Sequence, residues 1–215
     1  MMERIAPTGV GVALAVATAL LLTGCSSAEP KGSGKIEGAG QGASEPAPSH
    51  STDRRRVSTA GFDLPKDVTV AVEADTTGDK AKDAVLEGHA KTLMGRLEYL
   101  TGRDPKSPAI GRYVDDTARP PLVDQAEQAD GRNETVTGTF RYYQRKVTSV
   151  RKDIAQVTYC EDQSKAFSRN IGTGKVKKTE PSAQDYIAYT EALQKTGGSW
   201  RVLASKSERG AAACQ

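Results

Sequence analysis

Residues 135–148 read TVTGTFRYYQRKVT, a stretch in which β-branched and aromatic side chains predominate. This composition favours an extended strand over a helix. Beyond residue 131 the chain contains one proline, Pro181, so little interrupts the formation of strands there. We therefore expect this stretch to begin a run of antiparallel β-strands that continues to the end of the chain.

The segments that follow carry the same strand signal. Gly172-Thr173-Gly174 and Thr196-Gly197-Gly198-Ser199 lie between them and predict hairpin turns that need positive φ angles. Residues 186–195 (YIAYTEALQK) are ambiguous, because Ala, Glu, Leu and Gln favour a helix, whereas Tyr, Ile and Thr before a tight turn favour a strand. We favour the strand. The other predicted strands are residues 154–160, 165–170, 175–179 and 200–206.

The preceding part of the chain predicts one strand and several helices. Residues 68–73 alternate valine with other residues, as in a strand, and residues 79–101 repeat apolar positions at helical spacing. Prolines then divide the chain into short helices near residues 109–114 and 122–129. The order predicts an α+β fold, in which a strongly bent antiparallel sheet wraps around one long helix plus short helices.

The N-terminus has the pattern of an export signal. Residues 10–22 (VGVALAVATALLL) are too short an apolar run to cross a bilayer, which needs about 20 residues, but they fit the core of a signal peptide. Leu22-Thr23-Gly24-Cys25 follows and resembles the bacterial lipobox. The resemblance implies cleavage after Gly24 and acylation of Cys25, which would anchor the protein in the cell membrane with its domain on the extracytoplasmic side. The alternative is an ordinary secretory signal beside a chance cysteine.

Residues 26–61 are rich in Gly, Ser, Pro and Ala and poor in bulky apolar side chains. Such a segment cannot bury enough surface to offset its chain entropy, so we expect a disordered linker. The predicted organisation is a signal peptide over residues 1–24, a lipid-anchored linker over residues 25–61 and one domain over residues 62–215.

The composition excludes several functions. With two His and three Cys in 215 residues, neither a His-rich nor a four-cysteine metal site can form, and a formal net charge of +3 is too small to indicate nucleic-acid binding. No cofactor is predicted. If Cys25 carries lipid, Cys160 and Cys214 remain, and in an exported protein we expect them to form a disulfide. The alternative is two unpaired thiols.

Several motifs of the chain occur together in a recognisable order. They are the lipobox, Thr77-Gly78-Asp79 before the long helix, residues 157–162 (VTYCED), Gly172-Thr173-Gly174-Lys175, residues 198–202 (GSWRV) and the terminal Cys214. Together they resemble actinobacterial lipoproteins with a nuclear-transport-factor-2-like domain. The resemblance implies a cone of bent sheet around a helix, a cavity between them and a disulfide linking the Cys160 and Cys214 positions. It does not select a function, because the superfamily includes isomerases, dehydratases, transport factors and binding modules.

The domain offers few groups for chemistry. Its one histidine, His89, lies on the apolar stripe of the long helix, which favours a packed or rim residue over a catalytic base. Glu191 is the one in-strand carboxylate considered as a base, and we expect it on a solvated face. Residues that we expect to line a cavity are His89, Tyr142, Tyr159, Tyr186 and Trp200.

We therefore predict a membrane-anchored, non-catalytic module that binds an unidentified ligand or partner, such as a cell-wall polymer or another envelope protein. One alternative is an enzyme that uses the cone cavity, with isomerase-like or dehydratase-like chemistry. A carboxylate of raised pKa inside an apolar cavity would support that alternative. Another is an accessory domain that regulates an envelope protein, which a large exposed apolar patch would favour.

Overall fold

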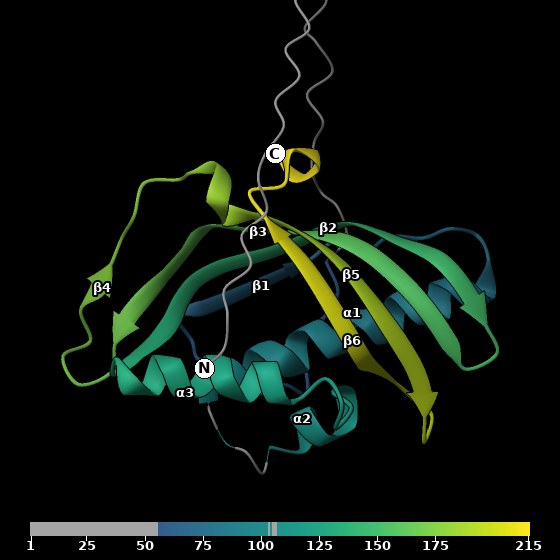
Figure 1. The fold of residues 1–215 in the computed structure, drawn as a ribbon, viewed down its shortest axis with the longest axis horizontal. Coiled ribbons are helices and arrows are strands. Elements are labelled where there is room, and N and C mark those ends of the chain that lie inside the picture. Colours follow the sequence, from purple (N-terminus) through teal and green to yellow (C-terminus); the bar gives the residue numbers. More distant parts are fainter. Residues whose placement is uncertain (1–55, 103, 105–106) are drawn as a thin grey trace, which may run out of the picture. The chain divides into compact units, whose positions relative to one another are not determined.

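The structure is a computed structural model that describes residues 56–102, 104 and 107–215. One sheet has the strand order β1-β2-β3-β5-β6, with the short β4 paired to β3 beside that path (Figure 1). The strands are β1 (Val68–Val72), β2 (Glu134–Arg151), β3 (Ile154–Asn170), β4 (Val176–Lys177), β5 (Tyr186–Thr196) and β6 (Ser199–Arg209). The helices are α1 (Lys80–Gly102), α2 (Pro108–Tyr113) and α3 (Pro120–Gly131), with single turns η1 (Ala183–Asp185) and η2 (Ala212–Cys214).

The predicted α+β class, bent sheet and long helix are confirmed. The ambiguous residues 186–195 lie in strand β5. The prediction of two strands over residues 154–160 and 165–170 is wrong, because both belong to the continuous β3, and neither Gly nor Pro interrupts residues 161–164. The pairings of β2 through β6 are antiparallel, whereas β1 pairs with β2 in parallel, since helices α1 to α3 connect the two strands.

The bend of the sheet comes from irregularities in β2. Its pairing with β3 shifts register three times, between Thr139 and Arg141, Tyr143 and Lys146, and Val147 and Ser149. Such bulges bend and twist a strand. Gly138 has a φ of +95°, and a β-carbon there would lie 2.1 Å from the Lys165 carbonyl oxygen, so this position requires glycine. The result is a sheet that curves over α1 (Figure 1).

Helix α1 lies against the concave face and supplies much of the core. Asp79 caps it, since its carboxylate accepts hydrogen bonds from the backbone N–H groups of Ala81 and Lys82 at 2.8 and 3.2 Å. The main core cluster joins helix residues such as Leu93 and Leu97 to sheet residues from β1, β2, β3, β5 and β6. A second, smaller cluster joins the end of α1 to α2 and α3. No helix among the described residues is long and apolar enough to cross a membrane.

The described chain begins a few residues before the predicted domain boundary. Arg56 forms an isolated bridge with Glu73, and the Val57 N–H donates to the Val72 carbonyl at 3.1 Å. Both contacts extend the edge of the sheet beyond β1. Residues 1–55, which include the predicted signal peptide, Cys25 and most of the predicted linker, lie outside the described residues.

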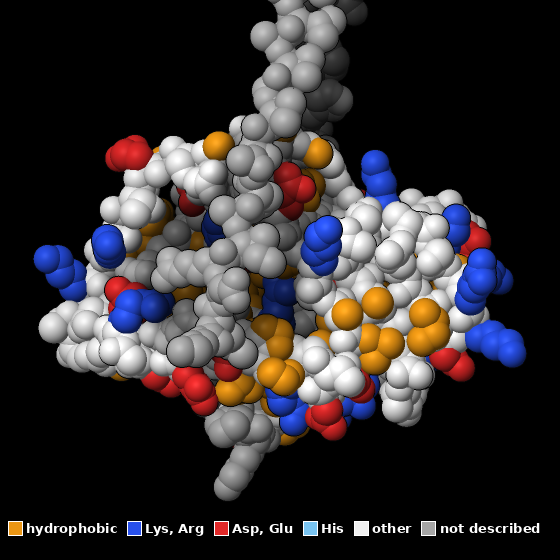
Figure 2. All heavy atoms as spheres, in the orientation of Figure 1, with side chains coloured by type: hydrophobic (Ala, Val, Ile, Leu, Met, Phe, Trp, Pro, Cys, Tyr) orange, Lys and Arg blue, Asp and Glu red, His pale blue; other side chains and the backbone are white. Residues whose placement is uncertain are grey.

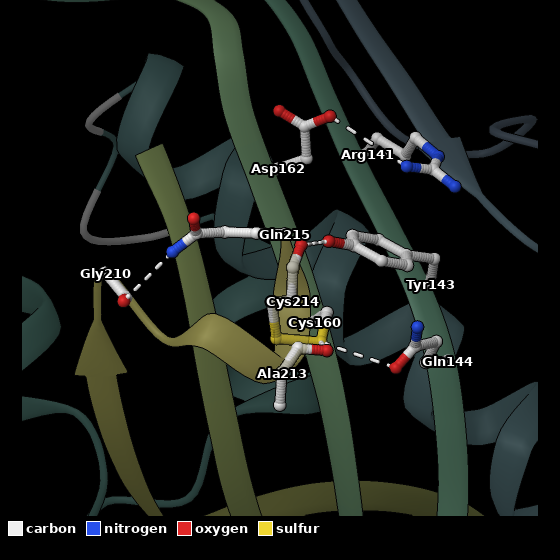
Figure 3. The surroundings of a disulfide bond; sticks show 9 residues. All are labelled: Arg141, Tyr143, Gln144, Cys160, Asp162, Gly210, Ala213, Cys214 and Gln215. Carbon is white, nitrogen blue, oxygen red and sulfur yellow. Dashed lines mark hydrogen bonds and ion pairs between the residues drawn. A yellow bond between two sulfur atoms is a disulfide. The ribbon is translucent and has the colours of Figure 1, made fainter. Parts of the chain in front are cut away.

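The predicted disulfide between Cys160 and Cys214 is present. It ties turn η2 to β3 across a Cα–Cα distance of 5.5 Å (Figure 3). The Tyr143 hydroxyl, on the neighbouring strand, donates a hydrogen bond to the Cys214 carbonyl. Tyr143, Cys160, Ala211 and Cys214 form a small buried cluster of their own, apart from the main core. The C-terminus is thereby fixed to the middle of the sheet.

Candidate functional site

A cavity of about 400 Å³ lies between the concave face of the sheet and the helices. Its apolar lining comes from α1, α3 and the strands, with side chains such as Leu97, Leu122, Phe140 and Phe167. Its polar lining consists of Thr92, Arg96, Gln125, Tyr142, Glu161, Gln163, Ser168, Tyr189, Glu191, Ser205, Ser207 and Arg209. Volume and mixed lining both fall within the range of small-molecule sites, which are apolar with a few placed polar groups.

Strand alternation determines which side chains enter the cavity. On β3, Tyr159 and Glu161 are two residues apart and therefore point to the same, concave face, whereas Cys160 between them points to the disulfide face. In register, Tyr142 of β2 lies opposite Glu161, and Tyr189 of β5 lies opposite Tyr159. The tyrosines and carboxylates of three strands thus meet on one face.

Glu191 is the centre of a buried polar network. One oxygen, Oε2, lies 3.2 Å from His89 Nε2, while Oε1 accepts hydrogen bonds from the hydroxyls of Tyr159 at 2.9 Å and Ser205 at 3.0 Å and from Arg96 at 3.3 Å. The side chain is 1% exposed, so the expectation that it lies on a solvated face is wrong. It shares the concave face with Tyr189, two residues before it.

Burial and neighbouring charges determine the protonation states of Glu191 and His89. Burial alone would raise the pKa of the Glu191 carboxyl, but the hydrogen bond from His89 and the charge of Arg96 outweigh it and lower the pKa below its usual value. Burial lowers the pKa of His89, and the neighbouring Glu191 offsets this only in part. Near neutral pH the network therefore contains an ionised Glu191 and a neutral His89.

Arg96 connects Glu191 to the rest of the cavity. Burial acts to lower the pKa of its guanidinium, but Tyr159, Tyr189 and Glu191 outweigh burial and raise the pKa well above the usual value. The guanidinium carbon lies 5.2 Å from the centre of the Tyr189 ring, which itself stacks on Tyr159 at 4.8 Å and an interplanar angle of 4°. This geometry holds a permanent cation against an aromatic pair.

Glu161 is the second carboxylate of the cavity and is bonded differently. Its nearest described cation is Arg96, whose Nη2 lies 3.8 Å from Oε2, too far for a hydrogen bond. Oε2 is buried without a hydrogen-bond donor among the described residues. Burial, next the charge of Glu161 and also a side-chain hydrogen bond to Glu161 raise the pKa of the Tyr142 and Tyr189 hydroxyls. These phenols therefore remain neutral beside the carboxylate.

The structure places the five predicted lining residues in different positions. Tyr142 lies in the lining. His89 and Tyr159 are buried directly behind it, where both contact Glu191. Tyr186 and Trp200 lie elsewhere, contrary to expectation. Tyr186 packs on the disulfide cluster, and Trp200 belongs to the main core.

Sequence reasoning did not predict two important residues of the site, Arg96 and Glu161. Arg96 is a charged residue within the apolar stripe of α1, and that conflict with its surroundings was the available signal. Glu161 adjoins Cys160, so a disulfide on one face of β3 already requires Glu161 to point to the other. Among the described residues, no group of three His, Cys, Asp or Glu side chains is arranged to bind a metal ion.

In comparisons with known proteins, this chain is similar to several solved structures. The chain matches no protein-family model, and no curated protein sequence is similar to it. The intermembrane-space region of the chloroplast protein ARC6 superposes with a TM-score of 0.41 at 9% identity, covering 61% of this chain and 98% of that one. A ketosteroid isomerase-like protein from Erwinia carotovora atroseptica superposes with a TM-score of 0.38 at 20% identity, covering 61% and 97%. At such values neither shared family nor shared function follows.

Proposed function

We propose that this protein is a lipid-anchored, extracytoplasmic binding module that holds a small ligand in the cone cavity without transforming it. The observation that carries the proposal is the cavity itself, which is large enough for a ligand and contains buried groups that can orient one. The lipobox pattern at Cys25 supports the anchor, and the polar segment after it would let the domain move near the membrane surface.

The electrostatics of the cavity favour binding over catalysis. A general acid or base works best when its pKa lies near the operating pH. The pKa of Glu191 is lowered, and its oxygens are occupied by the donors of His89, Tyr159, Ser205 and Arg96. The pKa of Tyr142 and that of Tyr159 are raised well above their usual value by burial. These shifts move the groups away from neutral pH in the direction that opposes proton transfer.

The surface gives less support to a role as a regulatory accessory domain. The exposed large hydrophobic side chains among the described residues are Ile154, Ile171 and Val176. Ile154 begins β3, whereas the other two follow or pair with its far end, so they do not form one patch. Figure 2 shows acidic and basic side chains interspersed over one face, which favours neither a strongly acidic nor a strongly basic partner.

The proposal is tested by isolating the protein from its own membranes, extracting it with organic solvent and identifying the released small molecules by mass spectrometry. Ala166→Trp fills the cavity from β3, and Ala204→Trp adds the same side chain at an exposed position of β6 outside the lining. We expect a compound that is recovered from the wild type and from Ala204→Trp but is reduced at least tenfold in Ala166→Trp.

Two results would contradict the proposal. Equal recovery from Ala166→Trp would place the compound outside the cavity, and conversion of the compound by purified protein would indicate an enzyme. If Ala166→Trp does not fold, Gln125→Trp at the cavity edge replaces it, because Gln125 is exposed. Gln128→Trp, exposed on the same helix α3 but outside the lining, is its matched control.

A further inference from the structure

Among the described residues, no hydrogen-bond donor reaches one buried carboxylate oxygen at the cavity, Oε2 of Glu161. Glu161 is 2% exposed, and the hydroxyls of Tyr142 and Tyr189 interact with its carboxylate, but Oε2 itself makes no hydrogen bond of ordinary geometry in the described part of the chain. A buried carboxylate oxygen left without a donor is costly, so most such oxygens are paired. Because Glu161 also lines the cavity, a ligand group that occupies the cavity can supply the missing donor.

The charges deep in the cavity favour a cation as the ligand group that donates to Glu161. Arg96, Glu161 and Glu191 are the basic and acidic lining residues there, and His89 behind them is neutral because its pKa is lowered. One positive and two negative charges leave a formal charge of −1 in a largely buried site. Arg209, the remaining charged lining residue, is exposed, and its guanidinium contacts the Gln184 carbonyl at 2.8 Å. Water therefore screens the Arg209 charge much more than the charges at depth.

The remaining lining fits the body of such a ligand. Tyr142 and Tyr189 lie close enough to Glu161 for its charge to raise their pKa, and a cation bound at the carboxylate would lie near these rings. The wall formed by Leu97, Phe140 and Phe167 is apolar. The site thus combines one anionic acceptor at depth with an apolar chamber.

We propose that the ligand is an amine carrying a single positive charge on an apolar body, and that its ammonium group donates a hydrogen bond to Oε2 of Glu161. This inference rests on the proposed binding function and adds the chemical class of the ligand. Arg96 contacts Glu191 and Tyr189, and its Nη2 lies 3.8 Å from Oε2 of Glu161, beyond hydrogen-bond distance, so it does not supply that donor.

The test compares three probes that share a phenylbutyl body and differ in charge: 4-phenylbutylamine, 4-phenylbutanol and 5-phenylpentanoate. Each is titrated by calorimetry into the full-length protein in lipid nanodiscs, with empty nanodiscs as the blank. We expect the amine to bind at least tenfold more tightly than the alcohol and the carboxylate to bind most weakly. Glu161→Gln keeps the shape of the side chain and should weaken the amine at least tenfold while changing the alcohol less than about threefold.

The outcomes separate this inference from the function on which it rests. If the alcohol or the carboxylate binds as tightly as the amine, or if Glu161→Gln leaves amine binding unchanged, the inference is overturned. In that case the loss of alcohol binding in Ala166→Trp would still support a ligand cavity. If none of the three probes binds the wild type, both the inference and the proposed ligand cavity are contradicted.

Discussion

His89 Nε2 lies 3.2 Å from Glu191 Oε2, and this contact joins helix α1 to strand β5 across 102 residues of sequence. Both side chains are shielded from solvent, at 0% and 1% exposure. The pair therefore connects the stability of the fold to the protonation of two groups behind the cavity.

The first prediction concerns stability against pH. Burial lowers the folded-state pKa of His89 below its usual 6.5, so the unfolded chain binds a proton at higher pH than the folded chain. The pKa of Glu191 is likewise lowered from 4.5. The free energy of unfolding contributed by the pair is thus complete above about pH 6.5 and falls as the solution becomes more acidic. Urea unfolding between pH 8 and pH 4 measures it.

His89→Gln is the matched control for this prediction. A glutamine amide can still donate to Glu191 but does not titrate. The variant should lose the part of the pH dependence that lies just below pH 6.5. If the free energy of unfolding of the wild type instead rises relative to that of His89→Gln as the pH falls, the folded state prefers the imidazolium. That result would contradict a lowered pKa for His89.

The second prediction concerns Gly88 of α1. A β-carbon at this position would lie 2.3 Å from Cδ1 of the Trp200 ring, so helix and sheet approach closely only because Gly88 has no side chain. Gly88→Ala should lower the free energy of unfolding by about 1–3 kcal/mol, although alanine is the better helix former. Gly111→Ala in α2 meets no atom within 4 Å and should instead be neutral or stabilising by up to about 1 kcal/mol. Equal effects of the two substitutions in chemical denaturation would refute the close approach.

The third prediction concerns the disulfide. Cys160 and Cys214 close a loop with a sequence separation of 54, for which the chain-entropy model gives about 4 kcal/mol of stabilisation. Cys214→Ser should lower the urea midpoint accordingly, and a reductant should lower the wild type to the same value without affecting the variant. Wild-type stability that does not respond to full reduction would contradict this role.

The fourth prediction concerns the anchor. Mass spectrometry of the membrane-extracted protein should find an N-terminal peptide that begins at Cys25 and carries acyl chains. Cys25→Ser removes the acceptor thiol and should abolish that peptide. An unmodified Cys25 in the membrane fraction would show that another mechanism holds the protein there.

Much of the fold could be predicted from local sequence, because local preferences and tertiary packing agree there. One kind of secondary structure is strongly favoured by each of three patterns: the apolar repeat of α1, the alternating valines of β1 and the β-branched stretch of β2. The continuity of β3 was missed because residues 161–164 (EDQS) are polar and resemble a loop. In the structure they continue as a strand because β2 pairs with β3 on both sides of this stretch.

The site was harder to predict because its residues break the usual rules of burial. Glu161 and Glu191 are carboxylates at almost fully buried positions, and such burial is rare unless the charge has partners. Those partners come from distant elements, as with Arg96 of α1 and Glu191 of β5, which are 95 residues apart. Single-sequence reasoning assigns an isolated glutamate in a strand to solvent. The alternation that starts from Cys160 would have corrected that assignment for Glu161.

The most direct test of a cavity that binds an amine at Glu161 is a crystal structure of the protein with 4-(4-bromophenyl)butylamine, located by the anomalous signal of bromine. The account predicts bromine among Leu97, Phe140 and Phe167, with the amine nitrogen about 3 Å from Glu161 Oε2. Bromine on the outer surface, or an amine turned away from Glu161 inside the cavity, would contradict it.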